Sequence, residues 1–70
     1  MPEGTEPLIH LAIKKHCYMA VQAMLMRGVD VNTKNHLGQT PLDVAESNNE
    51  IAIEGFLKDR GGIRTSMQAF

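Results

Sequence analysis

The chain has 70 residues with one cysteine, and its 7 Lys and Arg and 8 Asp and Glu give a formal net charge of −1. A chain of this length supplies at most one small hydrophobic core, and a single cysteine excludes an intramolecular disulfide and a zinc site built from several cysteines. The near-neutral charge and the 4% of aromatic residues argue against nucleic acid and anionic membranes as partners.

The composition also indicates where the protein works. Because Cys17 is the lone cysteine, we expect an intracellular protein, cytoplasmic or nuclear. No apolar run approaches the about 20 residues of a membrane span, and residues 1–5 lack the basic and apolar segments of a secretion signal. No residue pattern calls for a cofactor.

The first half of the chain predicts two short helices. Residues 1–6 are expected to be irregular, because Pro and Gly interrupt them. Apolar residues without a breaker predict a helix over 8–15, and apolar residues at three- and four-residue steps predict a second over 18–26. Gly28 stands where a helix C-terminus favours a left-handed residue, so the second helix ends before it. The two helices must turn back on each other because few residues separate them.

A turn-rich segment follows over residues 29–38. Its turn-forming residues are Asp30, Asn32, Asn35 and Gly38. With so few apolar positions between them, they predict a projecting loop that resembles a β-hairpin rather than a third helix.

The second half predicts another helix pair. Thr40 can accept a free backbone N–H at a helix start, and Pro41 suits the first helical position, so a helix is predicted over 41–47. The polar Asn48-Asn49 break leads into a helix over 50–58, which Gly61-Gly62 ends. Residues 63–70 show no periodicity and are expected to be flexible.

The two halves repeat at a spacing of 33 residues, although few identities support the repeat. The pairs at this spacing are Ala12 with Ala45, Arg27 with Arg60, and Gly28 with Gly61. The halves otherwise share helical character and apolar class more than identity. A fixed period of this size is typical of proteins that stack supersecondary units.

The motif around the projecting loop resembles the junction between two ankyrin repeats. It reads Gly28-Val29-Asp30-Val31-Asn32, Lys34-Asn35, Gly38, Thr40-Pro41-Leu42 and Ala45, against a repeat of about 33 residues that opens with T-P-L-H-x-A. The first opening, Pro7-Leu8-Ile9-His10-Leu11-Ala12, keeps His and Ala but displaces Thr and Pro, and Asp43 takes the His position of the second. The resemblance divides the chain into an irregular N-terminus (1–6), a first repeat with its finger loop (7–39), a cap-like second repeat (40–62) and a flexible tail (63–70).

The resemblance implies an all-α solenoid in which helix-turn-helix pairs are joined by a β-hairpin-like finger loop. It also implies a non-catalytic scaffold that binds another protein, since each repeat leaves an apolar flank for its neighbour and the loops line up beside the inner helices. By the same resemblance, the partner-binding residues are Thr33, His36, Leu37, Gln39, Lys14, Lys15, Ser47 and Asn48. The alternative is a structural cap of a longer ankyrin solenoid, without partner contacts of its own.

The two ends of the stack differ in polarity. Glu54 and Lys58 take positions that are apolar in interior repeats, and their i to i+4 spacing predicts a solvent ion pair on a terminal cap. The first pair shows no such polar surface, and we expect its apolar surface to meet further ankyrin repeats of a parent chain. The residues expected on that surface are Leu8, Ile13, Tyr18 and Met19. Among the other methionines, Met24 is expected in the core and Met26 at the surface.

Two residue groups suggest chemistry but have simpler interpretations. His10, His16 and Cys17 are metal-binding types without an acidic fourth ligand nearby, so we interpret His10 as a framework histidine and Cys17 as a small buried side chain, with no metal. No nucleophile, base and oxyanion donors gather in the sequence, so no catalytic residue is assigned. Lys14-Lys15 is compatible either with binding acidic partner residues or with solvating a turn.

Asn32 has both a structural and a chemical interpretation. Its setting resembles the substrate motif of the asparaginyl hydroxylase that acts on many ankyrin repeats, which implies hydroxylation of Asn32. The structural interpretation is that its side chain hydrogen-bonds the backbone of the finger loop.

Overall fold

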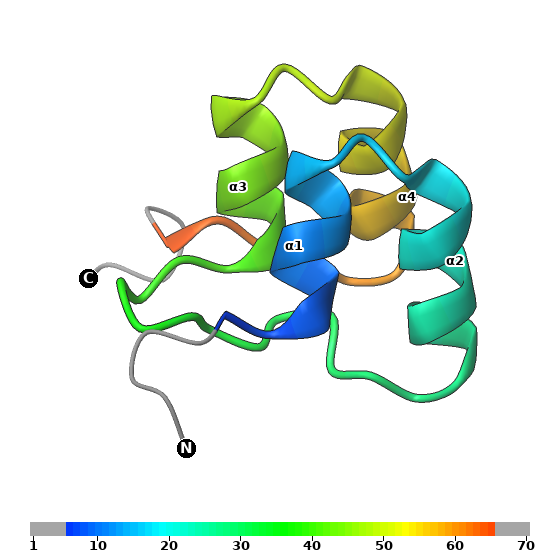
Figure 1. Ribbon diagram of the computed structural model, residues 1–70, viewed down its shortest axis with the longest axis horizontal. Helices are drawn as coiled ribbons and strands as arrows, with labels where there is room; N and C mark the ends of the chain where they lie inside the picture. Colours follow the sequence, from blue (N-terminus) through cyan, green and yellow to red (C-terminus); the bar gives the residue numbers. More distant parts are fainter. Residues whose placement is uncertain (1–5, 66–70) are drawn as a thin grey trace.

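Four helices make up the fold of the part of the chain that the structure describes. The computed structural model describes residues 6–65, and its helices are α1 (Leu8–Lys14), α2 (Tyr18–Met26), α3 (Pro41–Ser47) and α4 (Ile51–Asp59) (Figure 1). All four predicted helices are confirmed, with ends that differ by one residue in α1 and α4. Residues 6–65 contain no β-strand, so the loop between α2 and α3 is a series of turns and not a hairpin of strands. No helix in this range is long and apolar enough to cross a membrane.

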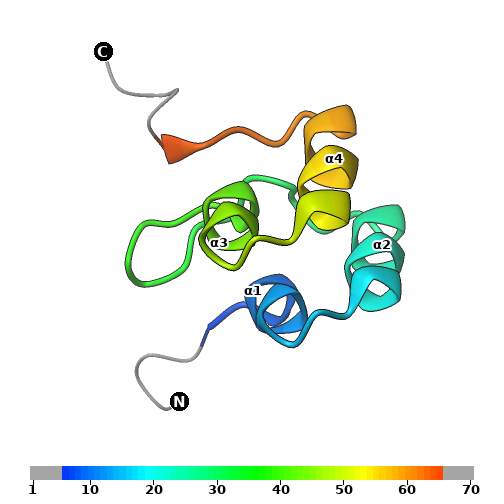
Figure 2. The ribbon, with the colours of Figure 1, turned by 90° about the horizontal axis from the view of Figure 1, so that it is seen from above.

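The helices form two antiparallel pairs that stack side by side. In each pair the two helices pack on each other, and α1 also packs on α3 while α2 packs on α4. Figure 2 looks along the helices and shows an inner layer of α1 and α3 beside an outer layer of α2 and α4. The finger loop, residues 27–40, crosses from the outer layer back to α3 and projects beyond the ends of the inner helices (Figure 1).

The core lies between these layers. Its buried hydrophobic residues are Ile9, Ala12, Ile13, Val21, Leu25, Leu42, Val44, Ala45, Ile53 and Leu57. The expectation that Ile13 lies on an open apolar surface is wrong, because Ile13 stands four residues after Ile9 on the same face of α1 and is 0% exposed. Leu8 and Met19 are 69% and 75% exposed, as expected of the open flank of the first pair.

The other flanking residues divide between core and surface. Tyr18 is 36% exposed and leans on Phe56 of α4, with a ring-centroid separation of 5.7 Å. Met24 packs against the core and Met26 is 68% exposed, which confirms both expectations.

Glu54 and Lys58 form no ion pair in residues 6–65, so that prediction is wrong. Such a pair at a solvated surface gains too little free energy to fix two long side chains.

Local backbone chemistry explains where the helices begin and end. Thr40 accepts a hydrogen bond from the Asp43 N–H at 3.2 Å, and the Asp43 carboxylate accepts one from the Thr40 N–H at 2.9 Å, which completes a capping box at the start of α3. Gly28 and Gly61 follow α2 and α4 with φ of 97° and 87°, as predicted for helix C-termini.

The segment after α4 is tied back to the second pair. The Ile63 N–H donates to the Asn32 Oδ1 at 2.9 Å, the Thr40 hydroxyl donates to the Ile63 carbonyl at 2.7 Å, and the Thr65 N–H donates to the Asp43 Oδ1 at 3.1 Å. Residues 63–65 are therefore bonded to the finger loop and to the start of α3. The remainder of the expected flexible tail, residues 66–70, lies outside the described residues.

Gly62 sets the route of this segment, and replacing it should destabilise the fold. Gly62→Ala would place a Cβ 2.8 Å from the Leu57 carbonyl oxygen, which is backbone and cannot move aside. We expect a loss of about 1–3 kcal/mol in the free energy of unfolding. Urea denaturation followed by circular dichroism measures it.

Gly55→Ala is the matched control. Gly55 is exposed within α4, and an added Cβ meets nothing within 4 Å. Alanine should therefore stabilise the helix by about 0.5–1 kcal/mol. Equal changes in the two variants would show that the close approach at Gly62 does not constrain the fold.

Candidate functional site

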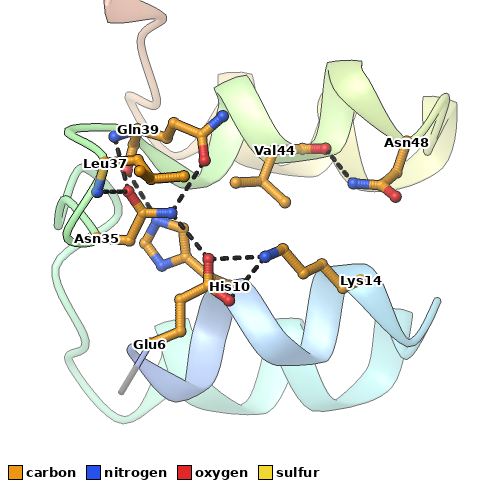
Figure 3. A network of polar contacts seen from close by, with 8 residues as sticks. All are labelled: Glu6, His10, Lys14, Asn35, Leu37, Gln39, Val44 and Asn48. Carbon is orange, nitrogen blue, oxygen red and sulfur yellow. Dashed lines mark hydrogen bonds and ion pairs between the residues drawn. The ribbon is translucent and has the colours of Figure 1, made fainter. Parts of the chain in front are cut away.

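Asn35 holds the tip of the finger loop in one conformation. Its Oδ1 accepts hydrogen bonds from the Leu37 N–H at 3.0 Å and the Gln39 N–H at 2.9 Å (Figure 3). Its Nδ2 donates to the Gln39 Oε1 at 3.0 Å and to the Glu6 Oε2 at 2.8 Å. Because Asn35 is only 7% exposed and both ends of its amide are satisfied, the tip is fixed by its own polar side chain.

The same network attaches the loop to α1. The buried His10 donates from Nε2 to the Gln39 carbonyl oxygen at 2.8 Å, which confirms its role as a framework histidine. Lys14 donates to both carboxylate oxygens of Glu6, at 2.8 and 2.9 Å. Figure 3 shows these side chains on one face of the inner layer, between the loop tip and the helices. The loop is therefore held by His10 of α1 and by Glu6, which precedes the helix and is itself held by Lys14.

Two carboxylates in this region have lowered pKa values. The hydrogen bonds from Lys14 lower the pKa of Glu6, the Asn35 amide lowers it further, and partial burial opposes both. Burial alone would raise the pKa of Asp43, but the hydrogen bonds from Thr40 and Thr65 outweigh it and lower this pKa as well. Both groups are therefore held in the charged form.

The predicted partner-binding residues lie in two groups. Thr33, His36, Leu37 and Gln39 belong to the finger loop, and Lys14, Lys15, Ser47 and Asn48 lie where α1 and α3 end. In the first group His36 and Leu37 are exposed, Leu37 at 68%, whereas Gln39 is half-buried in the Asn35 network. The loop tip therefore exposes His36 and Leu37 to solvent, whereas the side chain of Gln39 is held in the Asn35 network.

In the second group, two side chains form hydrogen bonds within the chain and two do not. Lys14 is bound to Glu6, and the exposed Asn48 donates from Nδ2 to the Val44 carbonyl oxygen at 2.8 Å (Figure 3). Lys15 and Ser47 are exposed, and their side chains have no hydrogen bond within residues 6–65. Of the two lysines, Lys15 is thus the one whose ammonium group is open to a partner.

Two residues of the site were not among the predicted contacts. Glu6 was expected in an irregular terminus, and Asn35 was noted only as a turn former. Glu6 bonds Asn35 across 29 residues of sequence, a pairing that no local pattern indicates. The ion pair of Glu6 with Lys14 joins residues eight positions apart, which is not the three- or four-residue spacing of helical ion pairs, so no local signal indicated it either.

Asn32 joins the finger loop to the segment after α4. Its Nδ2 donates to the Gly61 carbonyl oxygen at 3.2 Å, and its Oδ1 accepts from the Ile63 N–H. The expectation that its side chain bonds the backbone of its own loop is therefore wrong, since both partners lie about 30 residues away. Hydroxylation of Asn32 stays a prediction.

The three residues of metal-binding type, His10, His16 and Cys17, do not form one site. His16 pairs through Nδ1 with the Glu50 carboxylate, which links the two inter-helix turns. Cys17 is exposed, so its interpretation as a buried side chain is wrong; it stands in the turn before α2, outside the apolar face of either helix. Within residues 6–65, no three His, Cys, Asp or Glu side chains gather as metal ligands, and no pocket opens in the surface.

Comparison with known proteins finds one family. The family model described as "Ankyrin repeats (many copies)" matches residues 3–45, which is more than half of the 70 residues. Neither the comparison with curated proteins nor that with solved structures gives a significant match.

Replacing Asn35 should loosen the loop tip. Asn35→Ala removes hydrogen bonds to two backbone N–H groups and two side chains, so we expect a loss of about 2 kcal/mol or more in the free energy of unfolding. Amide hydrogen exchange should accelerate at Leu37 and Gln39. Lys34→Ala, at an exposed neighbour, should change stability by less than about 0.5 kcal/mol. Similar losses in the free energy of unfolding of the two variants would show that the hydrogen bonds of Asn35 do not hold the loop tip.

The free energy of unfolding should depend on pH through the carboxyl group of Glu6. A carboxyl group whose pKa is lowered by folding stabilises the fold at pH values above its unfolded pKa, and this contribution disappears as the pH falls through the folded pKa. Glu6→Gln should therefore be less stable than the wild type at pH 7, and the difference should shrink as the pH falls below the unfolded pKa of the carboxyl group and vanish below its lowered folded pKa. Urea denaturation at several pH values measures it. A difference that persists unchanged in acid would contradict the ion pair with Lys14.

Proposed function

The chain belongs to the ankyrin-repeat family, and on that premise we propose that it is a non-catalytic protein-interaction module. Ankyrin repeats generally mediate protein–protein interactions. In this proposal the partner protein binds to the finger loop and to the concave face formed by the inner helices. The observation that carries the proposal is Leu37, a large apolar side chain that is 68% exposed on a loop tip fixed by Asn35.

A fixed loop tip favours binding for an energetic reason. Ordering a flexible loop during association costs free energy that is subtracted from the affinity. The Asn35 network orders this tip before a partner arrives, so a contact to Leu37 is gained without that cost.

The proposal treats residues 7–39 and 40–62 as two stacked repeats of a short solenoid. The two helix pairs pack inner helix on inner helix and outer helix on outer helix, as successive units of a stack do. In this chain the finger between the two repeats is built from turns and not from a β-hairpin. The free thiol of Cys17 suits a reducing compartment, which agrees with a protein of the cytoplasm or nucleus.

A second candidate function is a structural cap within a longer ankyrin solenoid. The exposed Leu8 and Met19 on the flank of the first pair favour it, since a neighbouring repeat would cover them. In that role the chain would hold its neighbours and make no partner contacts through the finger loop. The two candidate functions predict different effects of a substitution at the loop tip on partner binding.

Leu37 and Met26 offer a matched test, because both are apolar and both are 68% exposed, one on the finger loop and one on the outer helix α2. Proteins captured from a cell lysate by the wild type are quantified by mass spectrometry against those captured by Leu37→Ser and Met26→Ser. Loss of an interface anchor should weaken a specific partner by about tenfold or more in Leu37→Ser alone. Partners retained by both variants would contradict binding through the loop and favour the capping role.

A further inference from the structure

His10 is a buried titratable group that the proposed function does not use. Its ring is 0% exposed and lies between α1 and the tip of the finger loop (Figure 3). Because the Gln39 carbonyl oxygen at 2.8 Å can only accept a hydrogen bond, Nε2 of the ring carries a proton. A neutral imidazole has one N–H, so Nδ1 is an acceptor, and it is buried without a hydrogen-bond partner within residues 6–65.

The residue that precedes α1 explains why this nitrogen has no partner. Thr40, at the equivalent place before α3, supplies a hydroxyl that accepts from the Asp43 N–H and donates to the Ile63 carbonyl oxygen. Pro7, which stands 33 residues earlier, has neither a hydroxyl nor an N–H. The N-cap of α1 therefore offers Nδ1 no donor while it is unprotonated and no hydroxyl once it carries a proton.

The neighbouring carboxylates do not bond this nitrogen. Glu6 lies close enough for its charge to act on His10, but both of its oxygens already accept hydrogen bonds from Lys14, and one accepts from Asn35 as well. The helix α2 carries no charged side chain. The other charged or titratable side chains at the loop end of the inner layer are Asp43, which accepts from backbone N–H groups, and the exposed Lys34 and His36.

We propose that His10 is a pH-sensitive latch on the finger loop, closed while its ring is neutral and opened by protonation in mild acid. A second proton would give Nδ1 an N–H in a buried position without an acceptor, and burying an unpaired donor or an unpaired charge is unfavourable. Water can satisfy that N–H only when the loop moves away from α1, which breaks the bond to Gln39. Histidine changes charge between pH 5 and 8, so mild acid is the condition that opens the latch.

Opening the latch affects the whole tip of the loop. The Gln39 carbonyl oxygen also accepts from the Asn35 N–H at 3.1 Å, and Asn35 in turn holds the Leu37 N–H. Glu6 keeps its charge in mild acid, because the hydrogen bonds from Lys14 lower its pKa, so its bond to Asn35 is not the contact that acid removes. The inference concerns the fold alone and holds whether or not the loop binds a partner.

Amide hydrogen exchange of the whole chain between pH 7 and pH 5, corrected for the intrinsic effect of pH on exchange, tests the latch. Because opening takes up one proton, protection of the Leu37 and Gln39 amides should fall by about five- to tenfold from pH 6 to pH 5. Protection of the buried Leu57 in α4 should stay higher at both pH values, because the loop opens without unfolding the helices. Loop protection that does not change with pH, or that equals the protection of Leu57, would overturn the proposal.

Glutamine variants identify the histidine responsible. His10→Gln keeps an amide donor for the Gln39 carbonyl oxygen but takes up no proton, so its loop protection should change by less than about twofold from pH 6 to pH 5. His16→Gln and His36→Gln make the same change at the two exposed histidines and should keep the wild-type dependence on pH. A dependence that persists in His10→Gln would overturn the latch.

The wild-type ring itself provides the test if His10→Gln does not fold. Nuclear magnetic resonance of the chain labelled with ¹⁵N-histidine shows which ring nitrogens carry protons. In molecules whose loop amides are protected, His10 should carry one proton, on Nε2, at pH 7 and at pH 5. A His10 ring that carries two protons while the Leu37 and Gln39 amides stay protected would overturn the proposal.

Discussion

Burial between the two helix pairs is the constraint on which the rest of the structure depends. Neither pair can hide its apolar face alone, and in the stack Ile9 and Ile13 of α1 and Leu42 of α3 fall to 1% or less exposure. A chain this short buries only about 60% of its unfolded surface, so it has little core to spare. The positions of α1 and α3 follow from that contact, and those positions decide where the finger loop begins and what its tip can reach.

Hydrogen bonds then fix the conformation of the loops, whereas the core fixes only where the loops begin and end. His10 and Asp43 occupy equivalent places, 33 residues apart, at the starts of the two inner helices. His10 donates a hydrogen bond to the carbonyl oxygen of Gln39, whereas Asp43 accepts hydrogen bonds from Thr40 and Thr65. The exchange of a donor for an acceptor means that the chain after α4 must approach α3 with an N–H group. His10 consequently holds the first loop by the carbonyl group of Gln39, whereas Asp43 holds the final segment by the N–H group of Thr65.

The sequence predicted the features that depend on neighbouring residues and missed those that depend on distant ones. Thr40 and Pro41 place the start of α3 because a cap acts within one turn, and Gly28 and Gly61 end helices for an equally local reason. Ile13 was assigned to the surface and Cys17 to the core because a short apolar run does not reveal which face another helix will cover. The bonds of Asn35 to Glu6 and of Asn32 to Ile63 join residues about 30 positions apart, and no local pattern encodes them.

Net charge and local pairing act over different distances on the surface of this protein. A formal value of −1 excludes strong attraction for polyanions at long range, where the charges of the whole chain are summed. At contact distance only unpaired groups count, because screening confines each exposed charge to about 8 Å at physiological ionic strength. Within residues 6–50, Glu6 and Glu46 are paired with the cations of Lys14 and Arg64, whereas Asp30 and Asp43 accept hydrogen bonds from neutral N–H groups and keep their full negative charge. The ion pair that helps to rigidify the finger loop therefore neutralises the carboxylate of Glu6, while that of Asp30 within the loop stays charged.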